Sequence, residues 1–429
     1  MKLPANHPLR FELNDEVHAR PPEALTPPCR ITYLAMIPVA GGRQAEWQHV
    51  SNLCQSRGVA PPRPDANHLA ADLGDCRFKW ERHTEFTRYM FIWPASGTKL
   101  FQGPWTTASL QGWIDGLAGE TLAAAQVELA SAPDRRFDAE AISKDCFASN
   151  SVVGATLSDG AATAFTDFRI GADGFSRVLV LDHSLAPRQA GRIVQRLLEI
   201  DTYRMLALLA LPVARDLGAF LVEHEKELSE ITVRLTEGGM PEEQALLARL
   251  TRLEAEIEGR FVSNYYRFNA SAAYYELVQR RIAELREKRL PGLQTLQEFT
   301  ERRLAPAMNT CRATAGRIEA LSERVSRSSQ LLTTRVGIER ERQNQGLLEA
   351  LANRAKLQLR LQQTVEGLSI AAITYYLVGL VGYLAKGFKS LFHGLEPEFV
   401  IALSVPFIGL GVAYALHKVR KGLETDREH

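Results

Sequence analysis

Histidine and acidic residues gather in two short segments of the N-terminal half, and their side chains could do chemistry. The first segment reads NDEVHARP over residues 14–21, and the second reads WERHTEF over residues 80–86. Imidazole and carboxylate groups bind metals and ligands, and they exchange protons with substrates near neutral pH. The candidate ligand-binding residues are Asp15, Glu16, His18, Glu81, His83 and Glu85.

The spacing within these two segments leaves three interpretations open. It matches no known ligand or catalytic pattern such as HExxH. On a β-strand, Glu81, His83 and Glu85 would share one face, which favours a polar network with a structural role. The alternatives are a ligand or metal site, and an enzyme that uses His18 or His83, which would require these residues to meet acids in one pocket. We expect no enzyme and no cofactor, and the identity of any metal stays open.

A second chemical pattern lies on one stripe near the C-terminus. Steps of four and three residues, starting at Asn353 and Leu357, select side chains that are small or weakly polar through the last part of the stripe. Small side chains allow close helix packing in lipid, and they also leave room for a hydrated ion inside a ring of helices. The candidate pore-lining residues are Arg360, Thr364, Gly367, Ala371, Thr374, Val378, Val381 and Ala385, and those at the pore mouth are Lys386, Glu396 and Glu398.

This stripe enters the first of two uncharged apolar segments. Leu368–Ala385 and Phe399–Leu416 contain no charged residue, and a polar linker separates them. Each is about as long as the shortest helix that crosses a bilayer, roughly 17–25 residues. We predict a transmembrane helical hairpin over residues 367–417. Two buried core helices are the alternative.

The N-terminal residues 1–184 predict a mixed α/β domain with a mostly antiparallel sheet. Apolar and polar residues alternate over residues 76–93, which indicates a β-hairpin or paired strands. The turn signals SDG and GADG separate later strands. Further strands are expected at residues 30–38, 121–130, 149–157, 162–170 and 176–182, and a helix at residues 44–57.

Long helices must connect this domain to the hairpin. Residues 185–305 predict a helical domain in which Pro212 ends or kinks a helix, and residues 306–366 predict a stalk helix that continues into the first span. A helix of this length needs neighbours. They could be residues 241–288 of the same chain or the same helix in other subunits. The expected fold class is α+β.

The composition favours a cytosolic body with a membrane-embedded end. Lys and Arg number 51 against 50 Asp and Glu, so nothing indicates a nucleic-acid partner. Five scattered cysteines without a CxxC motif suit a reducing compartment. The N-terminus lacks the apolar core of a secretory signal. We therefore expect two spans, both termini in the cytosol, and residues 418–429 as a basic cytosolic tail.

The order of these parts, together with LSIAAITYYLVGLVGYLAKGF and the later HKVRKGL, resembles the CorA family of divalent-cation transporters. The resemblance implies a homo-oligomer, with a pentamer favoured, and an ion pathway along the first span. The family's Gly-Met-Asn signature is absent, because residues 383–388 read YLAKGF. Lys386 would repel divalent cations, whereas Glu396 and Glu398 could partly offset its charge. The transported ion is therefore not assigned.

The whole chain is also similar to an uncharacterised family of bacterial membrane-anchored proteins, through NDEVHARP, KWERHTEFTRYMF and DTYRMLALLALPVAR. That resemblance implies placement in the bacterial inner membrane, with lipid as a partner. We expect either a CorA-like oligomeric ion channel or transporter, or a non-conducting membrane-anchored scaffold or sensor whose cytosolic domain binds a ligand or partner.

Overall fold

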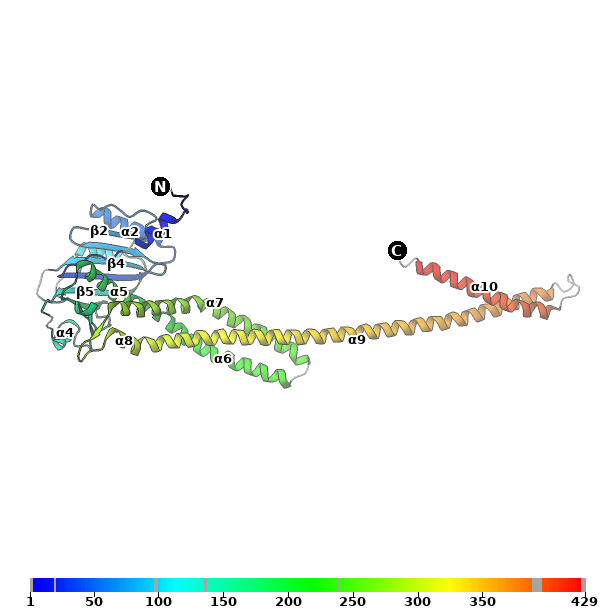
Figure 1. Cartoon of the computed structure of the whole chain (residues 1–429). Coiled ribbons are helices and arrows are strands. Elements are labelled where there is room, and N and C mark those ends of the chain that lie inside the picture. The colour runs from blue at the N-terminus through cyan, green and yellow to red at the C-terminus, as the bar shows by residue number, and fades with distance from the viewer. Residues whose placement is uncertain are drawn as a thin grey trace. The chain divides into compact units, whose positions relative to one another are not determined.

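The computed structural model describes residues 3–18, 21–95, 99–102, 104–134, 137–237, 240–387 and 396–425. The chain divides into two compact units, Met1–Ser329 and Gln330–His429. The first unit contains a β-sheet and a group of long helices (Figure 1). The α+β fold class is confirmed.

The described residues of the first unit form one nine-stranded sheet in the order β2-β3-β4-β1-β5-β8-β7-β6-β9. Its pairs are antiparallel except β5 with β8, so the predicted mostly antiparallel sheet is confirmed. The strands are β1 Cys29–Ile37, β2 His68–Asp72, β3 Arg77–Arg82, β4 Thr87–Pro94, β5 Glu120–Ser131, β6 Val153–Leu157, β7 Ala162–Thr166, β8 Ser176–Asp182 and β9 Lys288–Arg289.

Two predicted strands are shorter than expected, for local reasons. The predicted strand at 149–157 begins only at Val153, because Ser149 N–H instead donates to Ser143 O near the end of helix α4 (Ala139–Cys146). The predicted strand at 162–170 ends at Thr166, whose hydroxyl accepts the N–H of Phe168. These side-chain and backbone bonds compete with the sheet ladder.

Helices cover both faces of the sheet. Leu34 and Met36 of β1 pack with Val50 of α2 (Arg43–Ser56) and Leu110 of α3 (Ala108–Asp115) in one core cluster. On the other face, the Tyr33 hydroxyl lies 2.9 Å from Thr202 Oγ1 of α5 (Pro187–Leu208). Successive residues of one strand thus reach opposite layers, as the period of a strand requires.

The remaining helices of the first unit include three long ones, α6, α7 and the first part of α9, and two short ones, α1 and α8. They are α6 Ala210–Glu237, α7 Met240–Leu285, α8 Leu296–Arg303 and the first part of α9 Ala305–Gly387, preceded near the N-terminus by α1 Arg10–His18. The break predicted near Pro212 lies at Leu209, and the proline occupies the first turn of α6, where its missing N–H is not needed.

The stalk is part of α9, an 83-residue helix that confirms the predicted continuous element. Its apolar stripe is buried at Ile318, Leu321 and Val325. Arg317 on α9 pairs with Glu225 on α6 at 2.8 Å, so part of the supporting contacts comes from the same chain.

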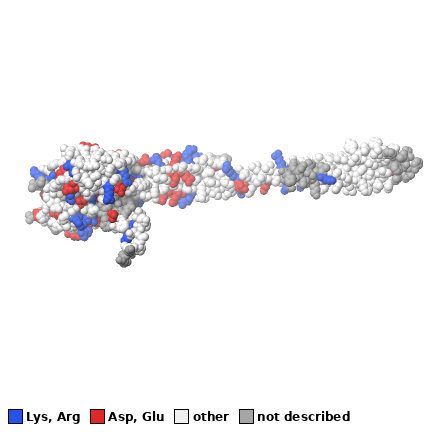
Figure 2. Space-filling view, turned by 90° about the horizontal axis from the view of Figure 1, so that it is seen from above, with Lys and Arg blue, Asp and Glu red and all other residues white. Residues whose placement is uncertain are grey.

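The second unit contains the rest of α9 and α10 Pro397–Thr425. Both predicted apolar segments are helical. Only 6 % and 0 % of their most apolar stretches are buried inside the protein, so the alternative of two buried core helices is wrong. The visible surface of this hairpin is almost free of charge, whereas both signs are interspersed over the first unit (Figure 2).

Three helical stretches among the described residues are long and apolar enough to cross a membrane. Besides the two predicted spans, Pro187–Leu235 is also long and apolar enough. A third (33 %) of its most apolar part is, however, buried inside the protein. This stretch contains α5, which packs on the sheet.

Candidate ligand-binding site

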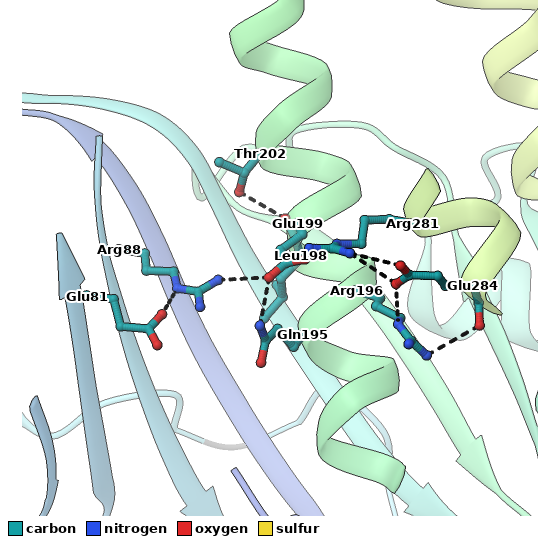
Figure 3. A network of polar contacts seen from close by, with 9 residues as sticks. All are labelled: Glu81, Arg88, Gln195, Arg196, Leu198, Glu199, Thr202, Arg281 and Glu284. Carbon is teal, nitrogen blue, oxygen red and sulfur yellow. Dashed lines mark hydrogen bonds and ion pairs between the residues drawn. The ribbon is translucent and has the colours of Figure 1, made fainter. Parts of the chain in front are cut away.

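Glu81 lies in a buried network of charges between the sheet and the helices (Figure 3). Its side chain is fully buried and accepts a hydrogen bond from Arg88 Nε on the neighbouring strand. Lys79 Nζ lies 3.0 Å from the other carboxylate oxygen of Glu81. Arg88 Nη1 also donates to Glu199 Oε1 on α5 at 3.3 Å. Arg88 therefore lies between two buried carboxylates.

The network continues from α5 into α7 (Figure 3). Arg281 Nε on α7 donates to Glu199 Oε2, and its Nη1 lies 3.1 Å from Glu284. Arg196 on α5 donates to Glu284 Oε2 at 2.9 Å. Opposite charges alternate along the whole path, so each buried charge has a partner. The network ties the sheet to two layers of helices.

This placement supports the structural interpretation of Glu81. A small cavity of about 20 Å³ beside it is also lined by Tyr33, Arg88 and Gln195. That volume holds about one water molecule and no larger ligand.

The network predicts a loss of stability in acid. Burial opposes ionisation of Glu81, but the charges of Arg88 and Lys79 and their hydrogen bonds outweigh it, so the pKa of Glu81 lies below its ordinary value. A carboxyl with a lowered folded-state pKa contributes stability that is present above its unfolded pKa, about 4.3, and is lost as the pH falls through the folded value. Unfolding midpoints measured from pH 7 to pH 3 should therefore fall steeply below about pH 4, and Glu81→Gln should flatten that fall. An equally steep fall in the variant would contradict the prediction.

The second segment does not present its three residues on one strand face, and this expectation is wrong. Strand β3 ends at Arg82, and residues 83–86 form a turn in which His83 N–H donates to Phe86 O at 2.8 Å. The His83 ring stacks on Phe86 with 4.4 Å between centroids. Glu85 pairs with Arg267 on α7. Glu81 therefore points into the network, while the other two residues belong to the turn.

Residues 14–18 of the first segment form the last part of α1, and residues 19 and 20 lie outside the described residues. Asp15 is exposed, and the side chains of Glu16 and His18 lie outside the described residues. Within the described ranges, no group of three or more His, Cys, Asp or Glu side chains could hold a metal ion.

A larger cavity of about 720 Å³ opens beside the turn, and we call it the turn cavity. Its lining comes from the β1–α2 loop, the start of α2, the β3–β4 turn, α5 and α7. The lining residues are Pro38, Val39, Ala40, Gly41, Gly42, Arg43, Glu46, Asn67, Arg82, His83, Thr84, Phe86, Tyr203, Tyr274 and Leu277. Its volume is in the range of small-molecule sites, roughly 300–1,000 Å³.

Aromatic rings form one wall of the turn cavity. His83 stacks on Phe86, which meets Tyr203 edge to face at 6.3 Å, and Tyr203 stacks on Tyr274 at 5.7 Å. Burial, followed by the charge of Glu199, raises the pKa of Tyr203 to about 12. Burial and a hydrogen bond with Glu85 raise the pKa of Tyr274 as well. Both phenols are therefore neutral hydrogen-bonding groups at physiological pH.

Cationic groups lie on the side of the turn cavity formed by α2. Arg82 Nη2 donates to Arg43 O at 3.1 Å, and Arg82 Nε lies 3.4 Å from Glu46 Oε2. Arg43 is exposed and donates to Asn67 Oδ1 at 2.7 Å. Among the residues that line the turn cavity, His83 is the one that the sequence analysis named as a candidate ligand-binding residue. A usable signal was the pair Gly41–Gly42, which follows a strand and opens a helix.

The predicted pore-lining residues divide into two groups on α9. Thr374, Val378, Val381 and Ala385 are half-buried, whereas Arg360, Thr364, Gly367 and Ala371 are exposed. A Cβ placed on Gly409 of α10 would lie 3.8 Å from the Thr374 methyl group, and one on Gly382 would lie 3.1 Å from Ile401 of α10. Part of the small stripe therefore packs against α10 of the same chain.

The predicted pore-mouth residues flank the linker between α9 and α10. Lys386, Glu396 and Glu398 are exposed, and residues 388–395 between them lie outside the described residues.

Comparisons with known proteins give a single family. The profile of a family described as a protein of unknown function (DUF3422) matches residues 5–423, nearly the whole chain. No curated protein and no solved structure matches the chain.

Proposed function

The chain belongs to the family of unknown function DUF3422, and from its geometry we propose that it is a membrane-anchored protein whose N-terminal unit binds a small ligand. One observation carries this proposal: the turn cavity is lined by the sheet layer and by helices α5 and α7 together. A ligand held there would contact both layers at once, so its binding would favour one arrangement of the helices. This is the role of a sensor, and it requires no reaction.

The membrane anchor in this proposal is the α9–α10 hairpin. The most apolar stretches of both helices are exposed, and bulky side chains such as Tyr375, Tyr376 and Leu380 lie on their surface. Contact of such a surface with lipid, rather than water, is what its composition favours. We propose two spans in an inner membrane, with both termini in the cytosol. The buried share of Pro187–Leu235 favours leaving that stretch outside the membrane.

Ligand binding can be tested by thermal unfolding of the purified full-length chain in detergent. Separate samples would receive a dicarboxylate, an amino acid, a sugar phosphate, a nucleotide or a divalent cation. A ligand that binds only the folded state adds about 2.7 kcal/mol of stability at 100 times its Kd. We expect at least one class to raise the midpoint, and Tyr274→Ala to remove the effect.

Tyr265→Ala is the matched control, because this tyrosine of α7 is 56 % exposed and does not line the turn cavity. Absence of a shift with every class, or a shift that survives Tyr274→Ala, would contradict the proposed function.

A second candidate function is ion conduction through a ring of α9 helices, in a homo-oligomer for which the CorA resemblance favours a pentamer. The exposed, small face at Thr364, Gly367 and Ala371 favours it. Thr374 is half-buried beside α10, and this weighs against a pore lined by the part of the stripe from Thr374 onward.

Ion flux into liposomes that contain the full-length chain would test this candidate, with Thr374→Leu as the comparison variant. Conduction through the stripe should be reduced by the larger leucine. Absence of flux for common cations and anions, or a monomeric mass in detergent, would reject the pore.

A further inference from the structure

We propose that the ligand of the turn cavity is a nucleoside phosphate, with its phosphate at the start of α2 and its base against the aromatic wall. This inference rests on the proposed function, because it names the ligand class of the same site. It requires two things of the cavity: a flat apolar surface at one side and an anion-binding surface at the other.

The flat surface is the series of rings at the turn and the two helices. His83, Phe86, Tyr203 and Tyr274 contact one another in sequence, with neighbouring centroids 4.4, 6.3 and 5.7 Å apart. Every nucleobase has a π-face that stacks on such rings. The tyrosine hydroxyls and the His83 ring nitrogens add hydrogen-bonding groups for the base edge. Aliphatic anions would leave this surface unused.

The anion-binding surface centres on two arginines. The Arg82 side chain is only 10 % exposed, and among the described residues its Nη1 has no hydrogen-bond partner. A buried guanidinium N–H without a partner is unfavourable, and a phosphate oxygen is a suitable acceptor. Arg43, exposed at the rim, supplies a second guanidinium.

The backbone at the start of α2 adds to this surface. Gly42 caps the helix without a side-chain hydrogen bond, so no cap side chain satisfies the first-turn N–H groups. Gly41 before it has φ +74°, and the Gly42 N–H donates to Val39 O at 2.9 Å, so the N–H groups offered to an anion are those of the first turn of α2. Helix N-termini of this kind favour phosphate.

One acid also lines the cavity and must be compatible with an anion. Glu46 accepts a hydrogen bond from Trp80 Nε1 at 2.7 Å and pairs with Arg82. The charge of Glu46 is therefore balanced by Arg82, and Arg43 supplies a further positive charge for a phosphate. The balance of groups at this end of the cavity favours an anion.

Equilibrium binding to the full-length chain in detergent tests the inference, with ATP, ADP and AMP as probes and with adenosine and inorganic phosphate as separate parts. We expect binding of at least one nucleotide, weakened about tenfold or more by Arg43→Glu through loss of a charge-assisted contact. Tyr274→Leu should weaken the nucleotide and adenosine alike. Arg188→Glu, an exposed arginine of α5 that does not line the cavity, should change nothing.

Unfolding midpoints without ligand would show that each variant is folded, and His83→Ala provides a second test of the aromatic wall. Nucleotide binding that is unchanged in both Arg43→Glu and Tyr274→Leu would overturn the inference. Inorganic phosphate that binds as tightly as every nucleotide would also overturn it. If a dicarboxylate or amino acid stabilises the protein through Tyr274 and no nucleotide binds, this inference fails while the proposed function stands.

Discussion

Replacing Arg88 with methionine is expected to lower the free energy of unfolding by about 3–5 kcal/mol, the usual effect of breaking a buried ion pair from one side. Arg88 lies between Glu81 and Glu199, and the side chains of both are at most 6 % exposed. Without the guanidinium, two buried carboxylates face each other across the space that it filled. Methionine fills much of the volume of the arginine side chain, so the lost free energy of unfolding reflects the missing charge and not a new cavity.

Chemical unfolding of the full-length chain, followed by tryptophan fluorescence, measures this change. All five tryptophans lie between residues 47 and 113, so the signal reports the sheet. Glu225→Gln is the control, because its pair with Arg317 is about a third exposed or more and should contribute less than about 1 kcal/mol. A loss below 1 kcal/mol for Arg88→Met would contradict the role of the network.

The second large effect is expected from Gly191→Ala in the first turns of α5. A Cβ at Gly191 would lie 1.7 Å from the carbonyl oxygen of Glu23, and this neighbour is backbone that cannot rotate away. The nearby bond from Leu25 N–H to Pro187 O, 2.9 Å long, fixes the same segment against the helix. Overpacking of this kind costs about 1–3 kcal/mol or more, and we expect a loss of at least about 2 kcal/mol.

Gly218→Ala is the matched control on α6, where a Cβ would meet nothing within 4 Å. Alanine is the better helix former, so this variant should gain up to about 1 kcal/mol in the same fluorescence assay. Equal effects of the two substitutions would show that the contact between α5 and Glu23 is not tight.

Much of the fold could be predicted because the relevant signals are local. The alternation in residues 76–93 corresponds to β3 and β4, and the absence of proline between Pro306 and Pro397 corresponds to the continuous α9. Strand β2 and helices α3 and α4 were not predicted. The N-caps Thr107 and Asp138 were signals for the two helices, because their side chains accept first-turn N–H groups.

The candidate site was harder to predict because its parts converge from distant segments. His83 and Tyr274 are almost two hundred residues apart in the sequence, yet both line the turn cavity. Glu81 was chosen for its neighbours in the sequence, but Arg88 links it to Glu199 on α5, and no periodicity connects the two carboxylates. Residue spacing along α9 identified the small stripe, but it could not show which part of the stripe packs against α10, because that depends on how the two helices contact each other.

Hydrogen–deuterium exchange of the full-length chain tests the central claim most directly, using the compound that gives the largest thermal shift. The account predicts slower exchange in three separated segments together: the start of α2 after Gly42, the turn at His83, and α7 around Tyr274. Protection confined to one of them, or located only in the α9–α10 hairpin, would contradict a ligand held between the sheet and the helices.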